Sequence, residues 1–292
     1  DLLQSDDAMT RHEWLIAPSL LQGSQSPDAR ILLGLAVDID ALITASPGLV
    51  TQSDTVEWDD AQGTLKAFRR AQIGRLTVNV KPLAKPSEEE LHQAMLNGIR
   101  DKGLSVLNWT PEAEQYRIRL HCAAQWLPEF DWPAVDEASL LANLENWLLP
   151  QMHGVHSLRA LKALDVKVAL QNLTDWSLRQ RLDTELPGHY TVPTGSRIAI
   201  RYHEDNPPAL AVRMQEMFGE ATTPAIAQGR VPLVLELLSP AQRPLQITRD
   251  LGAFWAGSYR EVQKEMKGRY PKHVWPDDPA NTAPTRRTKK YS

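Results

Sequence analysis

The chain has 292 residues, 42% of them hydrophobic and 23% charged, so it has enough apolar side chains for about two or three packed units of ordinary domain size. Its formal net charge of -4 excludes a protein that coats nucleic acid over its whole surface, although a local basic patch is compatible with an acidic average. No apolar run approaches the roughly 18 residues that a membrane-spanning helix needs, so neither export nor a membrane partner is expected.

Residues 1–85 are expected to form a small β-barrel. Short apolar runs alternate with turn residues there, and five of them are typical of strands: 13–17, 31–37, 55–58, 65–69 and 76–80. Asp59, Asp60 and Gly63 supply turn chemistry between the third and fourth runs, which predicts a hairpin over 56–70. Five short strands with few helices favour an OB-like fold, a partly open barrel, over a sandwich.

Residues 86–183 are predicted to be a helical domain. Ser87 and Glu90 form a capping box, and the helix that they begin should end near Gly103. Thr110 and Pro111 predict the next helix, with one face made of Tyr116, Leu120, Ala124 and Leu127. Cys122 lies on this helix as the single cysteine, which excludes an internal disulfide and indicates a small core residue in a reducing cytoplasm rather than a reactive thiol. Further helices are expected from Asp136 to about 148 and from Ser157 to about 168.

Residues 184–292 are expected to form a mixed α+β domain, which makes the whole chain α+β. Alternating apolar residues predict paired strands at 197–202 and 209–213, and a second hairpin from 232–237 and 244–248. Asp250 should cap a helix that carries Trp255, Tyr259, Val262 and Met266 on one side. Beyond Pro271 the recurring prolines exclude a helix, so the end of the chain should be extended.

Motifs for catalysis are missing from the sequence. It has neither the GxxxxGK[ST] loop that cradles ATP phosphates nor an Asp-Glu-x-His run that holds magnesium, so we expect no catalytic residue, no cofactor and no ATP hydrolysis by this chain alone. His153 and His156 are three residues apart, but no cysteine or carboxylate pattern completes a ligand set. A loop is therefore the better interpretation of these histidines, and no metal site is predicted.

Two segments combine cations with aromatic rings, a composition that suits nucleic acid because phosphates attract cations and bases stack on rings. The first, called the basic hairpin below, contributes the candidate contacts Lys66, Phe68, Arg69, Arg70 and Arg75. A solvated outer face explains those residues equally well. The second, called the tail (269–292), contributes Arg269, Lys272, His273, Arg286, Arg287, Lys289 and Lys290. Tyr270 and Trp275 of the tail are either stacking rings or buried anchors that hold it to its own domain.

The tail resembles the C-terminal end of the HrpB-type bacterial DEAH-box helicases, in which a similar Arg-Tyr-Pro-Lys-His…Trp-Pro run, here 269–276, precedes Pro-Thr-Arg-Arg, here 284–287. The chain departs from the family at Val274, where relatives commonly have a further proline. Five more blocks look like the terminal domain of that family: 191–198, 210–219, 229–233, 238–241 and 254–259. Residues 1–175 are similar, more loosely, to the region that follows the helicase core.

The resemblance implies a cytoplasmic, superfamily 2 ATP-dependent RNA helicase whose two RecA-like domains, winged helix and helical bundle lie before Asp1. The lack of an initiator methionine likewise suggests a piece of a longer protein. ATP and Mg²⁺ would then bind in the missing core, and the partners of this chain would be single-stranded or structured RNA, or DNA, and the core itself. In such helicases the barrel lies beside the channel through which RNA enters, which makes Lys66, Arg69, Arg70 and Arg75 the implied RNA contacts.

We therefore expect an accessory region that helps to hold RNA against an ATP-driven motor and stabilises the arrangement of the motor domains. The alternative is a protein-interaction module that docks a partner protein through the helical region or the C-terminal domain. In that case the tryptophans of the helical region would dock a partner protein through an exposed apolar patch, namely Trp126, Trp132, Trp147 and Trp176.

Overall fold

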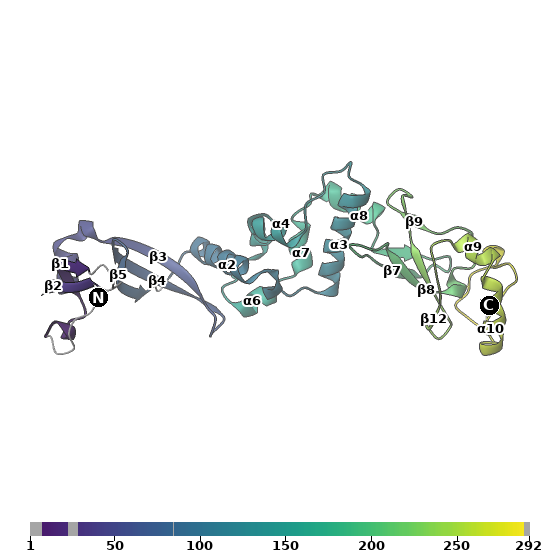
Figure 1. Cartoon of the computed structure of the whole chain (residues 1–292). Helices are drawn as coiled ribbons and strands as arrows, with labels where there is room; N and C mark the ends of the chain where they lie inside the picture. The colour runs from purple at the N-terminus through teal and green to yellow at the C-terminus, as the bar shows by residue number, and fades with distance from the viewer. Residues whose placement is uncertain (1–7, 23–28, 84, 289–292) are drawn as a thin grey trace. The chain divides into compact units, whose positions relative to one another are not determined.

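The computed structural model describes residues 8–22, 29–83 and 85–288 (Figure 1). The fold is mixed α+β, as predicted. It divides into two compact units, Asp1–Met95 and Leu96–Ser292. The predicted C-terminal domain and all but the first ten residues of the predicted helical domain fall within the second unit, and the division into 1–85, 86–183 and 184–292 stays a prediction. Within the described ranges, no helix combines the length and the apolar character needed to cross a membrane.

The first unit contains the five expected strands. Its elements are β1 Leu15–Gln22, β2 Ala29–Ala36, α1 Ile39–Ala45, β3 Thr51–Asp59, β4 Thr64–Ile73 and β5 Leu76–Pro82, with 3-10 turns at Ala8–Arg11 and Pro47–Leu49. Strands β3 and β4 form the predicted hairpin, which is confirmed. In the described part of this unit, β1 pairs with β2 and β4 pairs with β3 and β5, and no strand pairing joins these two sheets into a closed barrel. The OB-like barrel therefore stays a prediction.

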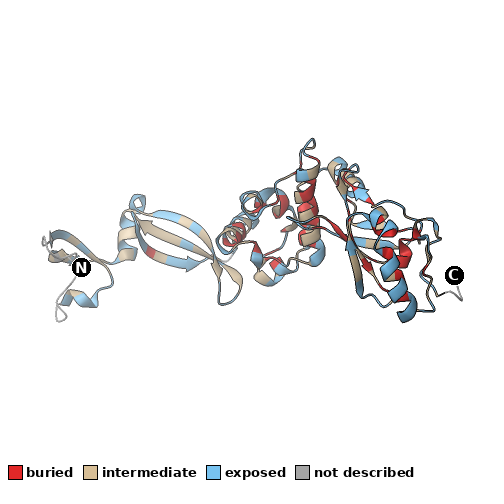
Figure 2. Cartoon of the chain, turned by 45° about the vertical axis from the view of Figure 1, so that its right-hand side comes forward, coloured by how far each residue is buried: buried red, intermediate tan, exposed pale blue. Residues whose placement is uncertain are grey.

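Few apolar side chains of the first unit are buried. Among the described strand residues of this unit, Val78 is the one apolar side chain that is buried. Strands β1 and β2 expose Ile16, Leu20, Leu21, Leu32, Leu33 and Leu35. Figure 2 shows the contrast, since most of the buried residues belong to the second unit.

Helices occupy the first half of the second unit, as predicted. They are α2 Glu88–Lys102, which begins in the first unit, α3 Pro111–Trp126, α4 Glu137–Ala142, α5 Leu144–Trp147, α6 Leu158–Lys162, α7 Val166–Gln171 and α8 Trp176–Glu185. The capping box is confirmed, because the Glu90 amide donates to Ser87 Oγ at 3.2 Å and the Ser87 amide donates to Glu90 Oε2 at 2.8 Å. Thr110 Oγ1 accepts from the Ala113 amide at 3.2 Å, which confirms the start of α3.

Three helices expected to be continuous are each divided in two, so that prediction is wrong. Asn143 separates α4 from α5, and Asp165 begins α7 by accepting a bond from the Val168 amide at 3.1 Å. Gly257 separates α9 Leu251–Ala256 from α10 Tyr259–Arg269, and its amide donates to the Ala253 carbonyl at 3.0 Å. The cap at Asp165 satisfies an amide that a continuous helix would bond within itself, whereas at Gly257 the backbone leaves the helical conformation. The face predicted for α3 is also wrong at Ala124, which is exposed.

A five-stranded sheet forms the core of the second half of this unit, in the order β12-β11-β8-β7-β6. The strands are β6 His189–Thr191, β7 Arg197–Arg201, β8 Ala209–Arg213, β11 Val234–Leu238 and β12 Pro244–Thr248, and β9 Ala225–Ile226 pairs separately with β10 Val231–Pro232. Both predicted pairs, β7 with β8 and β11 with β12, are confirmed. Strands β8 and β11 pair in parallel, which the alternation did not reveal. The remaining 3-10 turns are Leu104–Val106, Leu149–Gln151, Met214–Glu216 and Pro279–Asn281.

Candidate nucleic-acid interface

The basic hairpin carries its cations on both faces of the sheet. In the register of β3 and β4, Arg69 lies opposite Asp54 and Phe68 lies opposite Thr55. Because side chains alternate along a strand, Lys66, Phe68 and Arg70 share one face while Arg69 projects from the other. The structure therefore does not gather the predicted contacts of this hairpin on one surface.

Every β4 cation of the hairpin has a carboxylate partner on β3. The pairs are Lys66 with Asp59, Arg69 with Asp54, and Arg70 with Glu57. The Arg69 pair is bidentate, with Nε and Nη2 donating to the two Asp54 oxygens at 2.8 and 2.7 Å, and these bonds lower the pKa of Asp54. The positive charge of the strand is thus largely balanced by its neighbour, which weakens its attraction for phosphate.

The two other predicted contacts of the hairpin are Arg75 and Phe68. Arg75 is exposed in the turn between β4 and β5, and no ion pair is described for it within residues 8–22, 29–83 and 85–288. Phe68 is half-buried, with Thr55 and Pro82 opposite it on the two neighbouring strands. Among the described residues, the basic hairpin thus keeps one cation without an ion pair, Arg75, and one partly accessible ring, Phe68.

The tail is fixed to helix α10 by hydrogen bonds to its backbone. Gln263 Nε2 donates to the carbonyl oxygens of Trp275 and Pro276, at 3.1 and 2.5 Å. The Tyr259 hydroxyl donates to the same Pro276 carbonyl at 2.9 Å. Trp275 is only 4% exposed, and its indole N–H donates to the Tyr270 carbonyl at 3.0 Å. For Trp275 the buried-anchor hypothesis is confirmed and the stacking hypothesis is wrong.

Farther along, the tail is bonded to the segment after β8. The Gly219 amide donates to the Pro279 carbonyl at 2.9 Å, and the Thr285 amide donates to the Gln215 carbonyl at 3.0 Å. Beyond Pro271 the described residues of the tail contain no α-helix, as the prolines predicted, but they contain the 3-10 turn Pro279–Asn281. Asp278 caps this turn by accepting from the Asn281 amide at 3.3 Å. The tail backbone is therefore held at several points as far as residue 285.

Cations of the tail are freer than those of the hairpin. Arg269 makes one long contact, 3.7 Å to Glu265, between side chains that are both more than half exposed. Lys272, Arg286 and Arg287 are exposed, and none of them has an ion pair within the part of the chain that the structure describes. Over the residues that the structure describes, the tail thus presents three unpaired cations: Lys272 within the bonded stretch, and Arg286 and Arg287 directly after Thr285, whose amide is bonded to Gln215.

The other predicted tail contacts differ from these three. His273 is partly covered, and this burial, together with the nearby Arg213, lowers its pKa, so the ring adds little positive charge at pH 7. Tyr270 is half-buried and meets the His273 ring edge-on, at 6.2 Å between centroids. Lys289 and Lys290 lie outside the described residues.

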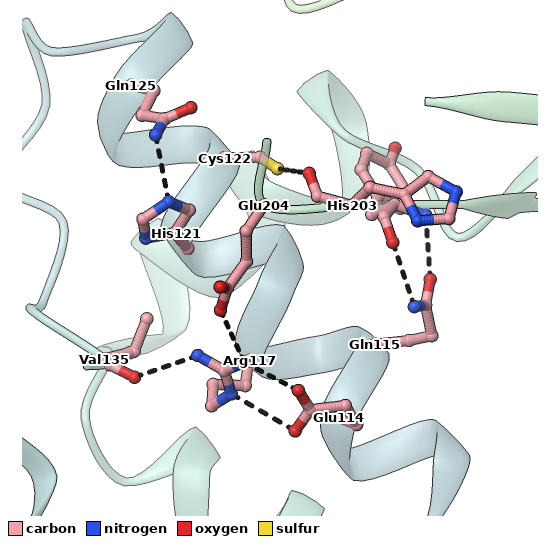
Figure 3. Close-up of polar contacts among 10 residues, drawn as sticks. Glu114, Gln115, Arg117, His121, Cys122, Gln125, Val135, His203 and Glu204 are labelled. Atoms are coloured by element: carbon pink, nitrogen blue, oxygen red, sulfur yellow. Dashed lines mark hydrogen bonds and ion pairs between the residues drawn. The ribbon is translucent and has the colours of Figure 1, made fainter. Parts of the chain in front are cut away.

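Helix α3 is bonded to the loop that follows β7 (Figure 3). Gln115 Nε2 donates to the Tyr202 carbonyl at 3.1 Å, and the Tyr202 amide donates to Gln115 Oε1 at 2.9 Å. Arg117 Nη2 lies 2.6 Å from a carboxylate oxygen of Glu204. Cys122 is fully buried and its burial raises the pKa of the thiol to about 12, so the expected core role of this residue is confirmed.

Most tryptophans of the alternative docking surface are used internally. Trp147 is fully buried and donates to the Leu140 carbonyl at 2.9 Å, and Trp132 is buried with a similar bond of 3.0 Å to the Leu127 carbonyl. Trp126 is half-buried, with its ring centroid 6.4 Å from that of Tyr202. Trp176 alone among these four is open to a partner, with 69% of its surface exposed.

A cleft that the sequence interpretation missed lies between α3, α7 and the edge of the sheet at β6 and β7. Its volume is about 600 Å³, and its polar lining includes Gln115, Arg119, Lys167, Asp183, His189 and Arg197. These residues come from five separate elements, α3, α7, α8, β6 and β7, and no local motif connects them. The described ranges hold no group of three or more His, Cys, Asp or Glu side chains suited to a metal ion.

Comparison with known proteins gives consistent matches. The C-terminal model of ATP-dependent helicases of the HrpB type matches residues 147–279, and the model for the connector region of the ATP-dependent RNA helicase HrpB matches residues 49–83. The ATP-dependent RNA helicase HrpB of Escherichia coli strain K12 is 81% identical over 291 residues, which are 100% of this chain and 36% of that protein.

Two solved structures agree with these matches. The crystal structure of the E. coli DExH-box NTPase HrpB has a TM-score of 0.72 and 81% identity, covering 98% of this chain and 36% of that one. A crystal structure of the E. coli DEAH/RHA helicase HrpB has a TM-score of 0.64 and 75% identity, covering 92% of this chain and 34% of that one. The chain spans about a third of the length of these relatives. It corresponds to the C-terminal region of the HrpB family of ATP-dependent RNA helicases.

Proposed function

We propose that this chain is the accessory C-terminal region of an ATP-dependent RNA helicase, where it binds single-stranded RNA and stabilises the arrangement of the motor domains. ATP and Mg²⁺ are assigned to those motor domains, since the sequence here has no GxxxxGK[ST] loop to cradle phosphates. In the same proposal the first unit is an OB-like barrel, the helical domain and the C-terminal domain follow it, and the protein works in the cytoplasm.

The observation that supports RNA binding most strongly is that the tail combines a buried tryptophan with exposed, unpaired cations over its described residues. Trp275 fixes the tail, whereas Lys272, Arg286 and Arg287 remain exposed and unpaired over the described residues. A backbone that is already ordered loses less entropy when it binds a ligand, so cations on it bind phosphates more tightly than the same cations on a loose tail. The basic hairpin contributes less, because RNA must compete there with Asp54, Glu57 and Asp59.

Fluorescence anisotropy of a labelled single-stranded RNA, titrated with the 292-residue chain at two salt concentrations, tests the RNA-binding part. The variant replaces three tail cations by glutamine: Lys272→Gln, Arg286→Gln and Arg287→Gln. For single-stranded nucleic acid, each phosphate contact contributes about 0.7 to the slope of the logarithm of the binding constant against the logarithm of the salt concentration. Loss of three contacts should therefore flatten this slope by about 2 and lower the affinity by about 100-fold at 0.1 M salt.

A matched control separates a specific contact from a change in net charge. It removes three exposed cations for which no ion pair is described in the same ranges: Lys162→Gln, Arg243→Gln and Arg249→Gln. We expect this control to keep most of the affinity. An equal loss in both variants would mean that only net charge matters, and an unchanged tail variant would remove the tail from the RNA path. RNA unwinding by a helicase that carries the tail substitutions then tests whether the contact serves the motor.

A further inference from the structure

The cleft between α3, α7 and the sheet edge contains a buried arginine that is held in one orientation. Arg119 is 9% exposed. Its Nε donates to the Leu186 carbonyl at 2.9 Å, and its Nη2 donates to Asp183 Oδ1 at 2.7 Å and to the Leu182 carbonyl at 3.4 Å. These bonds fix the plane of the guanidinium, because they engage two of its three nitrogens.

The third nitrogen of Arg119, Nη1, belongs to a lining residue of the cleft. No bond to Nη1 is described within residues 8–22, 29–83 and 85–288. Since Nη1 is not a fully enclosed atom either, solvent can reach it. A Cβ added to Gly188, another lining residue, would lie 3.9 Å from Nη1. The cleft therefore offers an oriented donor that a hydrogen-bond acceptor can reach.

Two further cations line other walls of the cleft. Lys167 comes from α7 and Arg197 from β7, and neither forms an ion pair with any residue that the structure describes. The acidic lining residues are Glu112 and Asp183, of which Asp183 is already paired with Arg119. The lining thus holds three cations against two carboxylates, without counting His189. This balance favours an anion.

An exposed ring lies on the helix that borders the cleft. On α8, Trp176 precedes Asp183 by seven residues, so the two positions share a helix face and lie about 10 Å apart along the axis. Asp183 lines the cleft, and Trp176 is 69% exposed. An exposed tryptophan presents a flat apolar surface on which a base can stack, with a gain of about 1–3 kcal/mol for each base.

We propose that this cleft binds the backbone phosphate of single-stranded RNA through Arg119, Lys167 and Arg197, and that a neighbouring base stacks on Trp176. The proposal rests on the RNA-binding role proposed above and adds to it a second contact site, on residues that the tail does not include. Inorganic phosphate would satisfy the same cations, but it has no base to stack on a ring placed two helical turns along α8.

The test is a titration of the 292-residue chain with a labelled single-stranded RNA, and with unlabelled inorganic phosphate as competitor. The cleft variant is Lys167→Gln with Arg197→Gln, which leaves the buried Arg119 in place so that folding is preserved. Its matched control, Arg159→Gln with Lys162→Gln, removes two exposed cations of α6. At a slope of about 0.7 per phosphate, the cleft variant should bind RNA about 25-fold more weakly at 0.1 M salt, and the control should bind as the parent does.

Trp176→Ala gives the independent readout. RNA should quench tryptophan fluorescence of the parent chain, and this quenching should be lost in the variant, whereas inorganic phosphate should quench neither protein. Unchanged RNA affinity in the cleft variant, or an equal loss in its control, would overturn the proposal. Displacement of RNA by millimolar phosphate with no loss of quenching in Trp176→Ala would indicate a small-anion site and overturn it too.

The tail variant separates this inference from the proposed function. Weaker RNA binding in the tail variant, with none in the cleft variant, rejects the cleft and keeps the accessory RNA-binding role. Unchanged binding in both variants rejects the cleft and the RNA-binding role together.

Discussion

The basic hairpin and the tail both combine cations with aromatic residues in the sequence, but they differ in how much of their charge is available. Both place several cations beside an aromatic residue. In the hairpin, Lys66, Arg69 and Arg70 each meet a carboxylate on the adjacent strand. In the tail, Lys272, Arg286 and Arg287 meet none over the described residues. The number of cations in a segment therefore does not measure its capacity to bind a polyanion.

The aromatic residues of the two segments differ in the same way. Phe68 of the hairpin is half-buried in a unit whose described strands bury one apolar side chain, Val78. Trp275 of the tail is buried in the unit that holds most of the buried residues (Figure 2). A ring inside a core fixes the backbone around it, and a ring at a half-open surface does not. The tail can thus be both ordered and charged.

Replacement of the anchor should have the largest effect. Trp275→Ala removes a buried indole and its hydrogen bond to the Tyr270 carbonyl, and we expect the free energy of unfolding to fall by about 3–5 kcal/mol. Phe68→Ala removes a half-buried ring and should lower it by less than half as much. Urea denaturation monitored by circular dichroism measures both changes. Equal losses would mean that the two rings have the same role, and the comparison would fail.

Removing the carboxylates of the hairpin should have the next largest effect. Asp54→Asn, Glu57→Gln and Asp59→Asn together release the three cations of β4, so the affinity for single-stranded RNA should rise by about tenfold or more, with a steeper salt slope. Anisotropy titrations at two salt concentrations measure this change.

The reciprocal variant completes this experiment. Lys66→Gln, Arg69→Gln and Arg70→Gln remove cations that are already paired, so this variant should weaken RNA binding by less than the tail variant does. A large loss would show that RNA displaces the carboxylates and that the paired hairpin is nevertheless a contact surface.

Local signals in the sequence predicted most elements of the fold. The Ser87 capping box, the Thr110-Pro111 helix start and the hairpin over 56–70 were each correct, because they depend on bonds between residues close in the chain. The breaks at Asn143, Asp165 and Gly257 are equally local, but a steady apolar period concealed them. The parallel pairing of β8 with β11 joins distant segments, and nothing local marks it.

Candidate sites were harder to predict, because the availability of a charge depends on its spatial neighbours. The sequence offered Lys66 and Arg286 as equal candidates, and only the cross-strand register shows that the first has a partner. Once a hairpin is predicted, acids at 54, 57 and 59 facing cations at 66, 69 and 70 are a signal that could have been used. The cleft around Arg119 had no such signal, since its walls come from distant elements.

The smallest expected effect is a pH dependence that belongs to the tail alone, because the hairpin strands β3 and β4 contain no histidine. Burial and Arg213 lower the pKa of His273 in the folded chain below its ordinary value of about 6.5. Between these two pKa values the unfolded chain binds more protons, so stability falls as the pH decreases from about 7 through 6.5 to the folded pKa. His273→Gln should reduce this fall slightly, in urea midpoints measured between about pH 5 and 7.5. Identical pH profiles of the urea midpoint for the parent chain and the variant would mean that the His273 imidazole titrates as it does in water. The tail would then be less closely held around His273 than the hydrogen bonds to the Trp275 and Pro276 carbonyls imply.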